Sequence, residues 1–172
     1  MKFDMFATVS MNGYIASVDG SEDCFSEDNW VEFKKVVLSY GNLIWGKNTY
    51  EKVLAWGEKY INDFEEVKIF VLTYSGSENK FSNVIFCKNL DDLSQKMEAN
   101  NVSKGLVSGG VTLYTDFLNQ GLIGKIILNY NSIIIDNGIP LFRNNEKNNI
   151  FNIKNSKIVN NKIIQIEMES EN

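Results

Sequence analysis

The chain has 172 residues, of which 44% are hydrophobic and 12% aromatic, so it is long and apolar enough to form one globular domain over residues 1–172. Its net charge of −5 argues against a nucleic-acid partner, and the absence of histidine excludes triads, metal sites and general acids built on histidine. No apolar run reaches the ~20 residues of a membrane span, and the first residues lack the layout of a signal peptide. We therefore expect a cytoplasmic protein with no membrane or metal partner, whose Cys24 and Cys87 stay unpaired.

Strand-like and helix-like apolar patterns alternate along most of the chain. In chain order, the predicted elements are a strand at 3–10, a helix at 27–40, a strand at 42–45, a helix at 48–56, strands at 67–73 and 83–87, a helix at 90–100, a strand at 105–108 and a helix at 110–121. Only strands are predicted from residue 124 onward, with Asn160 and Asn161 as a hairpin turn. Alternation implies parallel crossovers, and the final strands imply antiparallel additions at one edge. The predicted fold class is α/β, with helices on both faces of a mixed sheet.

Two predicted strand-to-helix junctions carry small or hydroxyl-bearing residues: "WGKNT" at 45–49 and "VSGG" at 107–110. Ligands bind at this edge of open α/β sheets, and free N–H groups at helix starts attract anions. Together the two junctions are suited to the diphosphate of a dinucleotide, with Lys47 supplying positive charge. The alternative is that Gly109 and Gly110 merely allow a tight turn and close helix packing. A G-x-G-x-x-G fingerprint is absent.

Five motifs occur in the order found in the RibD C-terminal reductase family: "TVSMNGYIA", "LIWGKNTYE", "KIFVLT", "LVSGGVTLYTDFLNQGLIGKIIL" and "GIPLF". Over about residues 1–142 the chain resembles a small stand-alone member of that family. The resemblance implies a dihydrofolate reductase-like, three-layer α/β/α fold with a mainly parallel sheet and a C-terminal antiparallel hairpin. It also implies NADPH-dependent hydride transfer to a small pterin- or pyrimidine-like heterocycle, as in the reduction of 5-amino-6-(5-phosphoribosylamino)uracil in riboflavin biosynthesis.

The same resemblance implies which residues bind the cofactor. The nicotinamide side corresponds to Ala7, Ile15 and Ala16, and the diphosphate turn to Gly46, Lys47, Asn48 and Thr49. The strand end beside the adenine ribose corresponds to Leu72, Thr73 and Tyr74. The second diphosphate wall corresponds to Ser108, Gly109, Gly110, Val111, Thr112 and Leu113. The family often has a cis peptide between the two glycines.

The chain also departs from the family pattern. Lys47 replaces the usual arginine, which weakens a preference for NADPH over NADH. Asn12, a predicted substrate contact, replaces an aspartate, and the arginines that hold a phosphorylated ribose are missing, which argues against the riboflavin precursor. Trp30 and Phe33 are further predicted substrate contacts that pack under a flat ring, or else two aromatic residues of the core.

One acid is predicted to be catalytic. Dihydrofolate reductases place a carboxylate at the start of the first helix, and Asp28 falls closest to that position. An acid there can protonate the substrate, whereas the alternative is an exposed carboxylate that stabilises the helix start. Ser26 offers cap chemistry to the same helix. The acidic cluster "DGSED" at 19–23 is expected to be a solvated loop over the cleft.

Two questions stay open at this point. The apolar stretch "KIILNYNSIII" at 125–135 is either central in the sheet or part of a dimer face, and the resembled family favours a homodimer. The function is either reduction or nucleotide binding without turnover. A true dihydrofolate reductase is the weaker alternative, because the proline-bearing turn of those enzymes is lacking and Pro140 is the chain's one proline.

Overall fold

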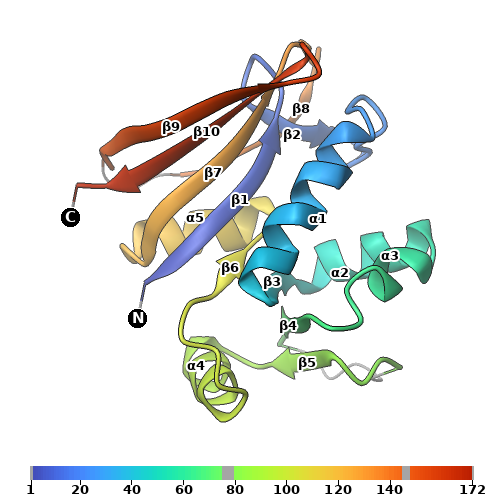
Figure 1. Ribbon diagram of the computed structural model, residues 1–172, viewed down its shortest axis with the longest axis vertical. Helices are drawn as coiled ribbons and strands as arrows, with labels where there is room; N and C mark the ends of the chain where they lie inside the picture. The colour runs from blue at the N-terminus through green and yellow to red at the C-terminus, as the bar shows by residue number, and fades with distance from the viewer. Residues whose placement is uncertain (1, 75–79, 145–147, 172) are drawn as a thin grey trace.

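The structure is a computed structural model that describes residues 2–74, 80–144 and 148–171 (Figure 1). In chain order its elements are β1 (Phe3–Val9), β2 (Tyr14–Ser17), α1 (Asp28–Tyr40), β3 (Asn42–Gly46), α2 (Lys47–Trp56), α3 (Lys59–Asn62), β4 (Lys68–Leu72), β5 (Val84–Cys87), α4 (Leu90–Ala99), β6 (Leu106–Val107), α5 (Val111–Asn119), β7 (Ile123–Asn131), β8 (Gly138–Pro140), β9 (Phe151–Val159) and β10 (Ile163–Ser170).

One large sheet organises the molecule, with the strand order β5-β4-β3-β6-β1-β7-β10-β9. The strands from β5 to β7 run parallel, whereas β10 is antiparallel to both β7 and β9. Asn160 and Asn161 turn the final hairpin with φ values of 49° and 56°, a conformation that asparagine tolerates. The predicted mixed, mainly parallel sheet with a C-terminal antiparallel hairpin is confirmed.

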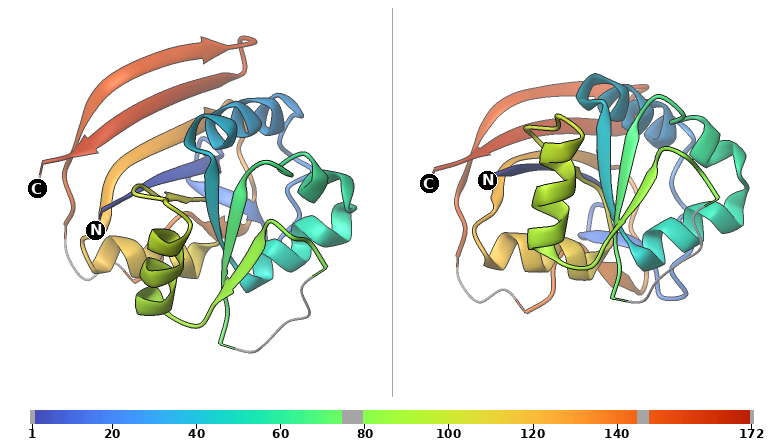
Figure 2. Two further views of the ribbon diagram at one scale, coloured as in Figure 1. Left: turned by 60° about the horizontal axis from the view of Figure 1, so that its bottom comes forward. Right: turned by 90° about the horizontal axis from the view of Figure 1, so that it is seen from below.

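Helices cover both faces of this sheet, which gives the predicted three layers (Figure 2). Buried side chains alternate along β3, so that Leu43 and Trp45 pack with α1, α2 and α3, while Ile44 packs with α4 and α5. In α1 the buried positions Asn29, Phe33 and Val37 recur every four residues, as expected of a helix with one face on a sheet. The rotation of α1 about its axis therefore turns these side chains toward the sheet.

One short strand pairing, one short helix and one cap differ from the predictions. β2 pairs with β8 in a separate two-stranded sheet, and α3 adds a single helical turn. Ser26 does not cap α1, whose first turn follows Glu27 without a side-chain cap. The stretch at 125–135 includes most of β7, which lies between β1 and β10, and this central place accounts for its apolar density.

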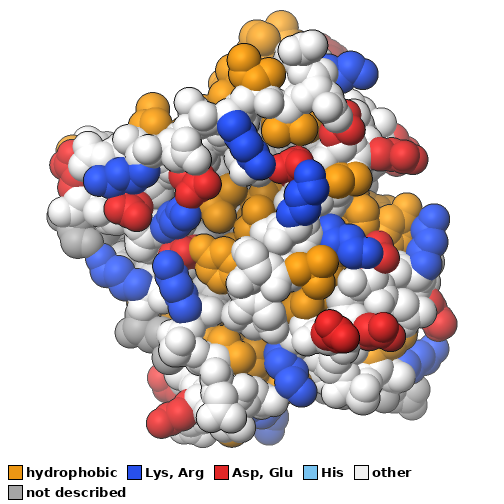
Figure 3. Space-filling model, in the orientation of Figure 1, with side chains coloured by type: hydrophobic (Ala, Val, Ile, Leu, Met, Phe, Trp, Pro, Cys, Tyr) orange, Lys and Arg blue, Asp and Glu red, His pale blue; other side chains and the backbone are white. Residues whose placement is uncertain are grey.

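No single sign of charge dominates the face of the molecule shown in Figure 3. Lysine, aspartate and glutamate side chains intermix on the face shown in Figure 3. Within the described ranges, no helix is both long and apolar enough to cross a bilayer, and Cys24 and Cys87 are free thiols.

Candidate active site

The two strand-to-helix junctions are neighbours in space. The Gly46 N–H donates to the Gly109 carbonyl at 3.0 Å, and the bond between Gly109 and Gly110 is a cis peptide. Gly109 has a φ of 113°, and a Cβ there would lie 3.0 Å from Cγ2 and Oγ1 of Thr49. Tight backbone geometry and close packing against α2 therefore account for glycine at 109. A Cβ at Gly110 would also come close to Thr49, 3.2 Å from its Oγ1.

The first cavity, which we call the helix-start cavity, has a volume of about 880 Å³ and lies at the starts of α2 and α5. Both helices begin at a glycine, without a side-chain cap and without an acid in the first turn. In contrast, the Asn89 side chain caps α4 by accepting from the Asp92 N–H at 2.8 Å. Lys47, Lys52 and Lys88 also line this cavity. Two open helix N-termini with lysines form a donor set that fits a diphosphate.

Most of the residues predicted to bind a cofactor line the helix-start cavity. They are Ile15, Ala16, Gly46, Lys47, Asn48, Thr49, Leu72, Thr73, Tyr74, Gly110, Val111, Thr112 and Leu113. Ser108 and Gly109 line the neighbouring cavity, and Ala7 is buried in the core and lines neither.

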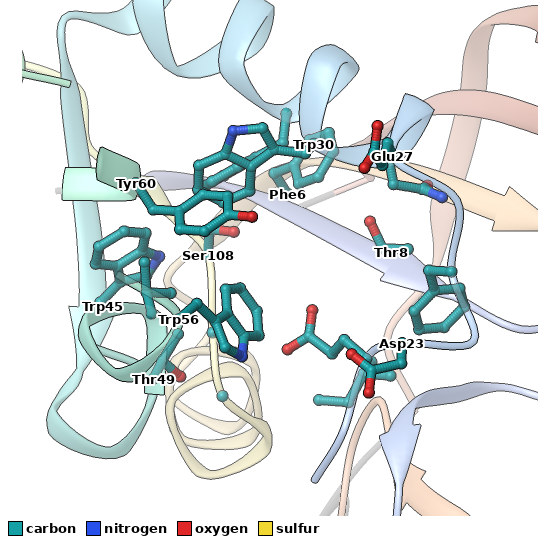
Figure 4. A pocket seen from close by; sticks show the side chains of 18 of the residues that line it. Phe6, Thr8, Asp23, Glu27, Trp30, Trp45, Thr49, Trp56, Tyr60 and Ser108 are labelled. Atoms are coloured by element: carbon teal, nitrogen blue, oxygen red, sulfur yellow. The ribbon is translucent and has the colours of Figure 1, made fainter. Parts of the chain in front are cut away.

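The second cavity, which we call the aromatic cavity, has a volume of about 440 Å³ (Figure 4). All three tryptophans of the chain line it, together with other rings. The full aromatic set is Phe6, Phe25, Trp30, Phe33, Trp45, Trp56, Tyr60 and Tyr114. The predicted substrate contacts Trp30 and Phe33 are thus part of both the core and the cavity wall. Such a wall suits a flat ring.

Glu22 lies where the two cavities meet, and it lines both of them. Burial raises the pKa of the half-buried Glu22 carboxyl to about 7, with a lowering effect from Lys52 and a raising effect from Asp23. Lys52 lines the helix-start cavity and Asp23 lines the aromatic cavity, so Glu22 stands between opposite charges. A carboxyl with this pKa can hold or release a proton near neutral pH. Residues 19–23 were expected to form a solvated loop over the cleft, and Glu22 is the residue of this loop that lines both cavities.

Asp28 borders neither cavity. Its carboxylate accepts a hydrogen bond of 2.7 Å from Asn160 in the turn between β9 and β10. Because Asn29 faces inward on α1, the residue before it points about 100° away around the helix. The geometry therefore fits the alternative, a carboxylate at a helix start, better than the predicted catalytic role.

Asn12 lines neither cavity and acts on the backbone. Its amide donates to the Ile135 carbonyl at 2.7 Å, and its side-chain oxygen accepts from the Ile135 N–H at 3.1 Å. These bonds tie the turn after β1 to the segment after β7, so the structure gives Asn12 a positioning contact in place of the predicted substrate contact.

The site residues that the sequence did not reveal come mainly from loops and helix ends. Glu22, Asp23 and Phe25 lie between β2 and α1, and Trp56 and Tyr60 flank the end of α2. Trp56 and Tyr60 could have been noticed in the sequence, because two large aromatic residues lie four residues apart on either side of Gly57, where the end of a helix does not require them. The acids gave no signal that separated Glu22 from its neighbours.

Comparison with known proteins supports the fold. No protein-family model matches the chain. It is 26% identical over 145 residues to the uncharacterized protein YwjB of Bacillus subtilis, which covers 80% of each protein. A putative riboflavin biosynthesis protein from Shewanella sp. PV-4 superimposes with a TM-score of 0.76 at 23% identity, with both chains covered in full.

A larger protein contains the same fold as one part. It is the Thermotoga maritima diaminohydroxyphosphoribosylaminopyrimidine deaminase/5-amino-6-(5-phosphoribosylamino)uracil reductase, with a TM-score of 0.74 at 15% identity. The match covers 98% of this chain but 56% of that protein, so this chain spans little more than half of its length. The chain therefore shares the α/β fold of structures named for riboflavin biosynthesis.

Proposed function

We propose that the chain is an NADPH-dependent reductase of a small, flat heterocycle, pterin- or pyrimidine-like, and a member of the RibD C-terminal reductase family. The observation that carries this proposal is the meeting of two unlike cavities at Glu22, Thr49 and Gly110. One has the donors for a diphosphate and the other has the walls for a ring. The fold shared with structures named for riboflavin biosynthesis supports a reductase in coarse terms.

The helix-start cavity is the proposed cofactor site. The open N-termini of α2 and α5 and the Lys47 ammonium would hold the diphosphate, while Leu72, Thr73 and Tyr74 border the far end. Bound NADPH would supply the hydride for the reduction.

Glu22, in place of Asp28, is the proposed proton donor. Its carboxyl lines the junction of the cavities, and burial raises its pKa to about 7. It would give a proton to a ring nitrogen, while the aromatic walls orient the ring and exclude water.

We also propose a cytoplasmic homodimer that forms through the C-terminal hairpin. Ile158 and Ile164 lie opposite each other on β9 and β10, and their side chains are 71% and 45% exposed. An apolar strip on a strand pair at the sheet edge is suited to association with a second copy.

Titration with NADPH and with NADH, followed by tryptophan emission, tests the cofactor site. All three tryptophans line the adjoining cavity, so saturable binding should quench emission or transfer energy to the nicotinamide. Lys47→Ala should weaken NADPH binding about tenfold through the lost charge at the phosphates, and Gly109→Val should abolish it. Lys162→Ala, which removes an equal charge from the hairpin, should leave it unchanged. Absence of saturable binding by either nucleotide would contradict the proposal.

A further inference from the structure

Charge is divided unequally between the two cavities. The helix-start cavity is lined by three lysines, Lys47, Lys52 and Lys88, and by three acids, Glu22, Asp91 and Asp116, so both signs of charge are present there. The charged residues that line the aromatic cavity are Glu22, Asp23 and Glu27, and no lysine or arginine is found among its described lining residues. A phosphate in the aromatic cavity would face three carboxyl groups without a counter-charge, which opposes binding.

The rings that line this cavity can accept a cation, since the Lys59 ammonium lies over the Tyr60 ring, 4.8 Å from its centroid. Tyr60 lies edge-on between Trp30 and Trp56, with ring centroids 4.9 Å and 5.9 Å away. The Trp30 indole N–H is used in a hydrogen bond of 3.1 Å to Asp63, which fixes this ring in the wall. Trp56 is 39% exposed and stands at the mouth, on the side opposite Asp23 (Figure 4). Aromatic faces of this kind favour a cation by about two- to thirtyfold in affinity.

Two polar groups add to the preference. Glu22 is poised between its neutral and ionised forms, and once its proton has passed to a ring nitrogen its carboxylate would pair with the positive ring, whereas an anion beside it would favour the acid. Ser26 Oγ is buried at the cavity and has no hydrogen-bond partner within the described residues, so it can bond to a ring substituent.

We infer that the aromatic cavity selects a nitrogen heterocycle that carries a positive charge and no phosphate. The acids, the ring faces and the exclusion of lysine from the lining all act in the same direction. This deepens the proposed function, and as an assignment of substrate class it rests on that proposal. It also separates this chain from an enzyme whose substrate is a phosphoribosylamino-pyrimidine.

Calorimetric titration with three quinolines of equal ring size measures the charge preference without any dinucleotide present. We expect 1-methylquinolinium to bind about tenfold more tightly than quinoline, and quinoline-4-carboxylate about tenfold more weakly. A second pair isolates the phosphate: thiamine should bind about tenfold more tightly than thiamine monophosphate.

Variants locate the effect in this cavity. Glu22→Gln should reduce the advantage of 1-methylquinolinium over quinoline to about threefold, and Glu98→Gln, an equal charge change on α4, should leave it intact. Trp56→Leu should weaken the cation several-fold, and Trp56→Phe should restore most of that loss because it keeps a ring face.

The outcomes distinguish failure of the cation preference from failure of the proposed reductase function. Equal affinities across the quinolines, or tighter binding of the anion, would overturn the inference even if NADPH binds normally. Cation selectivity that survives both Glu22→Gln and Trp56→Leu would also overturn it, because the probe would then bind elsewhere. Cation selectivity without NADPH binding would leave the cavity's preference in place and remove the reductase.

Discussion

Replacing Glu22 by glutamine should remove a pH dependence of folding stability. In the folded chain burial raises the pKa of Glu22 from 4.5 to about 7, with Lys52 opposing the rise and Asp23 adding to it. Between these values the folded chain holds a proton that the unfolded chain has released, so the free energy of unfolding falls as pH rises. The whole difference is about 3 kcal/mol, at about 1.4 kcal/mol for each tenfold change in proton affinity. This contribution is complete below the unfolded pKa and is lost as pH passes the folded one.

Urea unfolding of the wild type and of Glu22→Gln, repeated between about pH 4 and pH 8.5, measures this contribution. The variant should gain roughly 3 kcal/mol relative to the wild type across the range, because glutamine does not titrate. Glu98→Gln, at an exposed position on α4, should show a difference that stays constant within about 0.5 kcal/mol. A constant difference for Glu22→Gln as well would refute the placement of Glu22 as a half-buried carboxyl between the cavities.

Three further predictions concern the frame around the site. Gly109→Ala should lower the free energy of unfolding by about 2–3 kcal/mol, because φ of Gly109 is 113° and the new Cβ would lie 3.0 Å from Thr49. In a urea double-mutant cycle, adding Thr49→Ala should recover about 1 kcal/mol, and strictly additive effects would count against this contact. Asn129→Ala should lower the free energy of unfolding by about 2–3 kcal/mol in thermal or urea unfolding, since Asn129 accepts from Gln165 at 2.9 Å and donates to Asn29 at 3.3 Å in a buried network. A loss below about 0.5 kcal/mol would mean that water takes over the hydrogen bonds of the Asn129 side chain. Ile158→Lys should convert a dimer to a monomer in sedimentation velocity with an unchanged circular dichroism spectrum, and a monomeric wild type would disprove the proposed interface.

The fold was predictable because its determinants are local. Apolar runs of four to seven residues, typical of buried strands, alternate with segments whose apolar residues recur at helical spacing. This pattern alone implies parallel crossovers and two layers of helices. The pairing of β2 with β8 was not predictable, because the two segments are very short and far apart in the sequence. Nothing in the local pattern of Tyr14–Ser17 separates a strand from a polar loop.

The candidate site was only partly predictable for a related reason. The helix-start cavity follows from two junctions, each visible as a strand followed by glycine and a helix, whose neighbouring strands bring them together. The aromatic cavity depends on where a long loop and a helix end are placed, so Trp56 and Glu22 gave no comparable signal. A match to a helix start does not decide which of its side chains faces the cleft, because one residue along a helix turns a side chain by about 100°, and Asp28 bonds to Asn160 in the hairpin turn.

Hydrogen exchange of the backbone amides, measured with and without NADPH, tests the central claim most directly. The first N–H groups of α2 and α5 have no side-chain caps, so a diphosphate bound between them should slow exchange at residues 47–49 and 110–113 together. The hairpin of β9 and β10 should exchange at the same rate in both samples. Slowing at only one of the two helix starts, or none at saturating NADPH, would contradict the assignment of this cavity to the cofactor.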